Sequence, residues 1–158
     1  MRRGAIISER RLIERRGGTD TPVRVIELRL APRPEAVPRA RRALEGLTAM
    51  MSAASLEDAR LLVSELVTNS IRHGDLSSHE RIEVRVDVGE GALRVEVRDP
   101  GGGFELHPRT AESREDVGWG LYLVERLADR WGVDRDGSTL VWFELPLHRD
   151  AEDAASPA

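Results

Sequence analysis

The chain has 158 residues, enough for one domain with a hydrophobic core, and 40% apolar with 33% charged residues is a globular composition. The net charge of -4 argues against general nucleic-acid binding, and no run approaches the roughly 18 apolar residues of a membrane span. The basic start lacks the apolar core of a secretory signal. Cysteine is absent, which excludes disulfides and thiolate chemistry and fits a cytoplasmic protein.

Arginine supplies all 24 basic residues, while lysine and glutamine are absent and Asn69 is the only asparagine. P-loop NTPases and eukaryotic-type protein kinases both place a lysine on the nucleotide phosphates, so the chain belongs to neither class. Because this composition avoids asparagine, the presence of Asn69 requires an explanation.

The chain reads as one domain at 21–148 between a flexible basic lead at 1–20 and a flexible acidic tail at 149–158. Solvated ends explain both charge clusters better than docking arms do. Apolar periodicity predicts the following elements in chain order: a strand over 23–30, helices over 35–50 and from Ser55 to Gly74, strands over 81–88 and 92–99, a helix over 118–131, and a hairpin over 133–147.

Two details of this prediction concern helix ends. Ser55, with Asp58 three residues later, is an N-terminal capping signature, and Gly74 ends the same helix. The helix over 118–131 carries an apolar stripe: Leu121, Val124, Leu127, Ala128 and Trp131. The polar stretch 105–117 shows no periodicity and is predicted to be a mobile loop. We expect an α+β two-layer sandwich, with a mixed, mostly antiparallel sheet covered on one face by helices.

The helical segment S-E-L-V-T-N-S-I-R-H-G (64–74) places Glu65, Asn69 and His73 on one side, and its apolar face lies roughly opposite Glu65 and Asn69. The amide oxygen of Asn69 suits a hard cation such as Mg²⁺. Glu65, one turn earlier, can accept a proton from a hydroxyl or a water. A solvated helix face is the alternative, and it is the better explanation for Glu65 taken alone.

Two glycine-rich segments are further candidates. In D-P-G-G-G-F (99–104), the Asp99 carboxylate at a strand end can accept a hydrogen bond from an exocyclic amine, and Gly101 and Gly103 let a flat ring approach the backbone. G-W-G-L (118–121) opens a helix whose free N–H groups suit an anion. The alternatives are a tight turn and a glycine-capped helix start.

The order and spacing of these patterns are more specific than any one of them. E-x-x-x-N on a helix is followed by D-x-G-x-G after a strand, G-x-G-L opening a helix, and G-S-T-L-V-W-F-E-L-P at the last hairpin. Over residues 23–147 the chain resembles the GHKL superfamily of ATP-binding proteins, the Bergerat fold. It is most similar to the bacterial anti-sigma-factor serine/threonine kinases of that superfamily.

The resemblance implies a role for each matching residue. Asn69 would coordinate Mg²⁺ at the ATP phosphates, and Glu65 would be the general base. Asp99 would bind the adenine amino group, with Thr139 supporting it from the last strand. Residues 104–117 would form a lid over the nucleotide. The other implied nucleotide contacts are Gly101, Gly103, Gly118, Gly120, Leu121 and, more loosely, His73.

The function implied is ATP-dependent phosphorylation of a small anti-anti-sigma-type protein, together with binding and inhibition of a sigma factor. Family members often form homodimers, and neither nucleic acid nor a membrane is an expected direct partner. One alternative is a module that binds partners under the control of ATP without phosphotransfer. Another, a detached catalytic domain of a histidine kinase, lacks the dimerising helical pair that carries a phosphoacceptor histidine.

Overall fold

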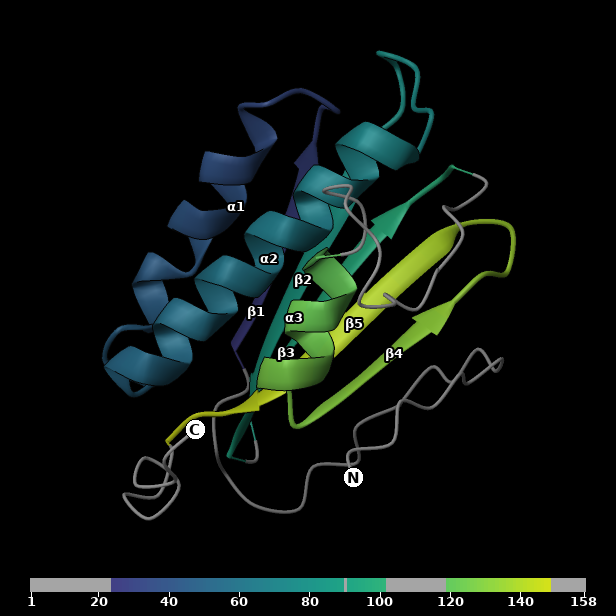
Figure 1. Cartoon of the computed structure of the whole chain (residues 1–158). Helices are drawn as coiled ribbons and strands as arrows, with labels where there is room; N and C mark the ends of the chain where they lie inside the picture. The colour runs from purple at the N-terminus through teal and green to yellow at the C-terminus, as the bar shows by residue number, and fades with distance from the viewer. Residues whose placement is uncertain (1–23, 90, 102–118, 149–158) are drawn as a thin grey trace.

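The computed structural model describes residues 24–89, 91–101 and 119–148, which form a sheet with helices on one face (Figure 1). The predicted flexible ends at 1–20 and 149–158 lie outside these residues. The elements are β1 (Arg24–Leu30), α1 (Ala36–Ala43), the short 3-10 helix η1 (Glu45–Leu47), α2 (Ala53–His73), β2 (Ile82–Gly89), β3 (Ala92–Asp99), α3 (Trp119–Leu127), β4 (Arg130–Asp134) and β5 (Thr139–Pro146).

The five strands follow the order β1-β2-β3-β5-β4, and each neighbouring pair is antiparallel. The predicted α+β sandwich is therefore confirmed, although the sheet of the described residues is antiparallel throughout rather than mixed. Both predicted hairpins form. Gly91 and Gly137 stand in their turns with φ angles of 77° and 69°, a backbone region that glycine tolerates best.

Side chains alternate across the sheet, which gives it one buried face and one face that no described helix covers, called the uncovered face below. Val84, Val86 and Val88 are buried in the hydrophobic core, whereas Glu83 and Arg85 point to the uncovered face. The buried face packs against α1, α2 and α3. Burial of each large aliphatic side chain contributes about 1.5–3 kcal/mol. This one-sided core fixes α2 above the middle of the sheet.

Helix α2 begins at Ala53, two residues before the predicted start at Ser55. Its N-cap is Ser52, whose hydroxyl accepts a hydrogen bond from the Ser55 backbone N–H at 3.1 Å. Ser55 itself is fully buried in the first turn. The prediction was wrong here because two serines stand three residues apart, and the nearby Asp58 favoured the second.

Two other helix predictions were too long. The segment predicted as one helix over 35–50 is divided into α1 and η1. Helix α3 ends at Leu127, and Trp131 belongs to β4, opposite Phe143 of β5. The segment R-W-G-V-D fits a strand as well as a helix, and pairing with β5 decides between them.

The end of α2 packs tightly against the end of β3 through two glycines. Gly74 caps α2 with φ −74°, and the left-handed residue is the next one, Asp75, with φ 49°. A Cβ atom on Gly101 would overlap the Gly74 carbonyl oxygen and lie 2.8 Å from its carbon. The absence of a side chain at Gly101 therefore allows this backbone-to-backbone contact.

We expect Gly101→Ala to destabilise the protein by about 1–3 kcal/mol, because the added methyl group must displace backbone rather than a flexible side chain. Gly46→Ala is the matched control, since its Cβ would meet only the end of the Arg24 side chain, at 3.1 Å. Urea unfolding of both variants measures the difference. Equal midpoints for the two variants would contradict the tight contact.

The described residues contain no helix long and apolar enough to cross a membrane.

Candidate functional site

Helix α2 supplies the first group of candidate side chains. Glu65, Asn69 and His73 follow one another at intervals of four residues, so they lie along one side of the helix. All three are half-buried, whereas Arg72 beside them is exposed. The half-burial of Glu65 and Asn69 distinguishes this side from an ordinary solvated helix face.

Asp99, the last residue of β3, is held by hydrogen bonds at both carboxylate oxygens. The Ser70 hydroxyl of α2 donates to Oδ2 at 2.7 Å, and the Gly101 backbone N–H donates to Oδ1 at 3.0 Å. Burial raises the pKa of Asp99, the two hydrogen bonds oppose that shift, and the charge of Glu80 adds to it. Asp99 is only 2% exposed, so the fold bears the free-energy cost of burying a carboxyl group.

Thr139 lies directly opposite Asp99 in the pairing of β3 with β5. It is 2% exposed, and its hydroxyl has no hydrogen-bond partner within the described part of the chain. A buried hydroxyl without a partner costs about 1–3 kcal/mol, so such groups usually bind a water or a ligand. The Asp99 carboxylate and the Thr139 hydroxyl together fit an adenine ring, which offers an amine donor beside ring nitrogen acceptors.

The remaining candidates fall partly outside the described residues. Gly120 and Leu121 are in the first turn of α3, which lies against α2, and Leu121 is half-buried. Gly103, Gly118 and the predicted lid at 104–117 lie outside the described residues.

The metal expectation concerns Asn69. Across 24–89, 91–101 and 119–148, no cluster of three or more histidine or acidic side chains could hold a metal ion. Mg²⁺ does not require such a cluster, because proteins commonly bind it through one or two side chains together with phosphate and water oxygens. The half-buried amide of Asn69 is compatible with that arrangement.

Sequence reasoning missed Ser70. It lies on the buried face of α2. Its hydroxyl, however, bonds to Asp99 rather than to the helix backbone. A small polar residue on a buried helix face, next to a candidate ligand residue, was the signal available.

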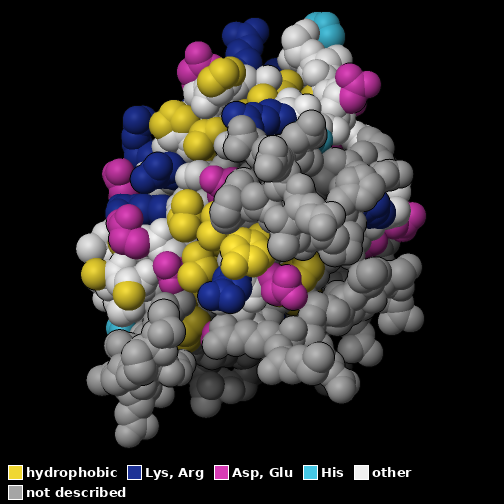
Figure 2. All heavy atoms as spheres, viewed as in Figure 1, with side chains coloured by type: hydrophobic (Ala, Val, Ile, Leu, Met, Phe, Trp, Pro, Cys, Tyr) yellow, Lys and Arg dark blue, Asp and Glu magenta, His cyan; other side chains and the backbone are white. Residues whose placement is uncertain are grey.

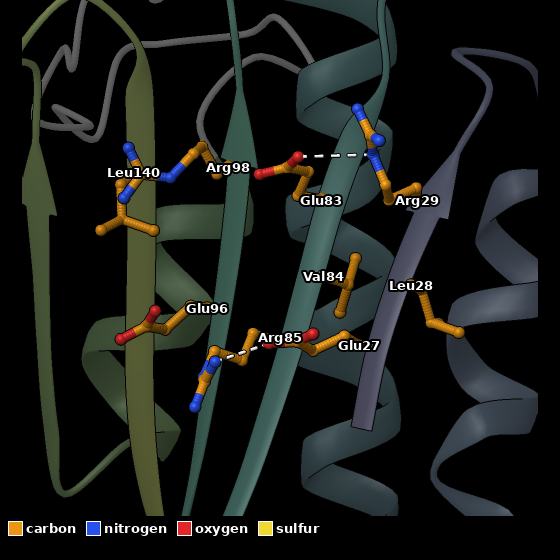
Figure 3. Close-up of a pocket in the computed structure, with 9 residues that line it drawn as sticks. All are labelled: Glu27, Leu28, Arg29, Glu83, Val84, Arg85, Glu96, Arg98 and Leu140. Carbon is orange, nitrogen blue, oxygen red and sulfur yellow. Dashed lines mark hydrogen bonds and ion pairs between the residues drawn. The ribbon is translucent and has the colours of Figure 1, made fainter. Parts of the chain in front are cut away.

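A separate groove of about 300 Å³ lies on the uncovered face of the sheet (Figure 3). Its walls carry both signs of charge, with ion pairs between Arg85 and Glu27 at 2.6 Å and between Arg29 and Glu83 at 3.5 Å. Asp99 alternates onto the opposite, helix-covered face. The groove is therefore distinct from the candidate site.

The helix-covered side shows charged side chains mixed with apolar ones (Figure 2). Among them, Leu61 of α2 and Tyr122 of α3 are 40% and 38% exposed. Leu61 precedes Glu65 by one helical turn, so an apolar contact surface lies close to that carboxylate.

The fold and these residues define a class of protein. The chain belongs to the histidine kinase-like ATPase domain family, which it matches over residues 30–144. Within it, the chain is similar to the serine-protein kinase RsbW of Bacillus licheniformis, with 30% identity over 81% of this chain and 89% of the relative. It is also 34% identical to the RsbW of Listeria innocua, over 66% of this chain and 75% of the relative.

A solved structure shares the fold. The RsbU and RsbW domains of a Mycobacterium tuberculosis protein align with a TM-score of 0.61 at 22% identity, covering 80% of this chain and 32% of that longer chain. The expected Bergerat-type ATP-binding fold and the expected relationship to bacterial serine/threonine kinases are confirmed.

Proposed function

We propose that the protein is an ATP-dependent serine/threonine kinase that phosphorylates an anti-anti-sigma-type protein and also binds a sigma factor. The proposal rests on the buried pair of Asp99 and Thr139, in which the Thr139 hydroxyl has no partner among the described residues. The Ser70 hydroxyl links Asp99 to α2, the helix that also carries Glu65 and Asn69. The serine-protein kinases among its relatives support the same reaction. The proposal places the protein in the cytoplasm, where its partners act, and includes a homodimer as the working form.

The two ends of the site have different tasks. Asp99 and Thr139 would bind the adenine ring, while Asn69 would hold Mg²⁺ at the phosphates. When bound, Mg²⁺ would supply the positive charge that neutralises the phosphate oxygens, which this chain cannot supply with lysine. Gly120 and Leu121 lie in the first turn of α3, where their backbone N–H groups can donate hydrogen bonds to the ATP phosphates.

Glu65 acts on the attacking hydroxyl. As the partner's hydroxyl oxygen bonds to the γ-phosphorus, the bond from that phosphorus to the ADP oxygen breaks, and Glu65 accepts the hydroxyl proton. Positioning and charge stabilisation supply most of the rate in phosphoryl transfer. The exposed Leu61, one turn away on α2, gives a protein substrate an apolar contact beside this carboxylate.

The test uses the wild-type protein with γ-labelled ATP, Mg²⁺ and the anti-anti-sigma proteins of its host. We expect label on a partner serine or threonine, and we expect EDTA to abolish it. Asn69→Ala should reduce transfer and weaken Mg-ATP binding in the same preparation, because the amide oxygen is the metal ligand. If ATP controls partner binding but no phosphate is transferred, the protein is an ATP-controlled binding module and not a kinase.

A further inference from the structure

We propose that Ser70 is a positioning residue that makes the site select a purine with a 6-amino group over one with a 6-oxo group. The inference rests on the proposed ATP site at Asp99 and assigns to Ser70 a part in its specificity. It concerns a side chain that contacts Asp99 rather than the reacting atoms.

The bond between Ser70 and Asp99 is unusual for a helical serine. Helical serine hydroxyls commonly donate to the backbone carbonyl one turn earlier. Ser64, on the same helix, does so, with its hydroxyl 2.6 Å from the Arg60 carbonyl oxygen. Ser70 instead donates across the core to Asp99, at 2.7 Å. Its hydroxyl hydrogen is thus committed to the end of another element.

This bond determines what Asp99 can offer a ligand. Ser70 and the Gly101 N–H each donate to one carboxylate oxygen, and both bonds favour the ionised carboxylate. An ionised carboxylate only accepts hydrogen bonds, so it attracts a 6-amino group and repels a 6-oxo group. The buried position removes the water that would weaken this discrimination.

Removal of the Ser70 hydroxyl changes that chemistry. Oδ2 loses its donor, and burial then favours the protonated acid with less opposition. A protonated carboxyl group can donate to a 6-oxo oxygen, which an ionised one cannot. The preference for ATP over ITP, which carries the 6-oxo group, should therefore narrow.

The experiment measures the affinities of Mg-ATP and Mg-ITP for wild type, Ser70→Ala and the control Ser64→Ala. Wild type should prefer ATP by at least about 100-fold, as sites that hydrogen-bond a ligand amine do. Ser70→Ala should bind ATP about 3- to 30-fold more weakly and reduce the ATP-to-ITP ratio by about tenfold or more. Ser64→Ala should keep the wild-type ratio, because its hydroxyl bonds within its own helix.

Two further variants separate positioning from packing. Ser70→Thr keeps a donor and should restore most of the ratio, while Ser70→Cys, with a weak S–H donor, should give an intermediate ratio. If Ser70→Ala does not fold, these two variants carry the test. An unchanged ratio in Ser70→Ala, or in Ser70→Cys where alanine does not fold, would overturn the inference while the ATP site stands. Wild type that binds neither nucleotide would instead overturn the ATP site itself.

Discussion

Replacing Glu65 by glutamine should slow phosphoryl transfer by about 10²- to 10⁴-fold and leave ATP affinity within a few-fold of wild type. Glutamine keeps the shape of the side chain but has almost no basicity, so the proton of the attacking hydroxyl loses its acceptor. Nucleotide affinity and single-turnover transfer to the partner, measured on one preparation, give the two quantities. Glu57→Gln is the control, because Glu57 is an exposed glutamate on the same helix, paired with Arg60.

The two readouts distinguish three outcomes. Transfer at the wild-type rate in Glu65→Gln would remove Glu65 from the mechanism. An equal loss of ATP affinity and transfer would make Glu65 a nucleotide ligand instead of a base. If ATP still controls partner binding while transfer is lost, regulation and catalysis are separable in this protein.

Asp99→Asn should weaken ATP binding by about 100-fold or more. Ser70 and Gly101 both donate to the carboxylate, so an amide must turn its NH₂ group toward one of these donors or toward the adenine amine. Calorimetric titration of Mg-ATP measures the loss. Asp87→Asn is the matched control, since Asp87 is also largely buried but pairs with Arg85 on the uncovered face. Wild-type affinity in Asp99→Asn would contradict the adenine assignment.

The same variant has a pH signature in stability. The pKa of Asp99 is raised above its ordinary value of 3.8, so the folded state holds this proton to higher pH than the unfolded state does. The contribution of Asp99 to stability therefore falls as pH rises from 3.8 through the raised pKa, and stays low above it. Asp99→Asn should lack this fall, and wild type should show it in unfolding free energies measured across that window.

The strands were the most predictable part of the structure. Alternation over 23–30, 81–88 and 92–99 matches β1, β2 and β3 to within one residue at each end, because one face of the sheet is buried and the other is charged. Local patterns could not decide between Ser52 and Ser55 as the cap, or assign Trp131 to a strand. Both depend on distant segments, because the Ser52 N–H donates to the Leu147 carbonyl oxygen and Trp131 pairs with Phe143.

The arrangement of the candidate site could not be predicted from local sequence patterns. Asp99 and Thr139 meet only because β3 pairs with β5 instead of β4, a choice that periodicity does not reveal. Their adjacency came from the family resemblance. The structure also adds a reason for Gly101, which makes room for the Gly74 backbone as well as for the proposed ring. Ser70 was hidden because a helical period shows which face is buried but not which buried hydroxyl bonds across the core.

The uncovered face of the sheet also limits how copies of this protein can meet. Arg94 lies over the Trp142 ring, 3.9 Å from its centroid, and bonds to Glu96 and Glu144 at 2.8 and 3.0 Å. Stacking another sheet there would strip water from these charges, at several kcal/mol for each ion left without new partners. This charged network therefore disfavours the stacking of a second sheet on the uncovered face, so association through the helices or the sheet edges costs less free energy.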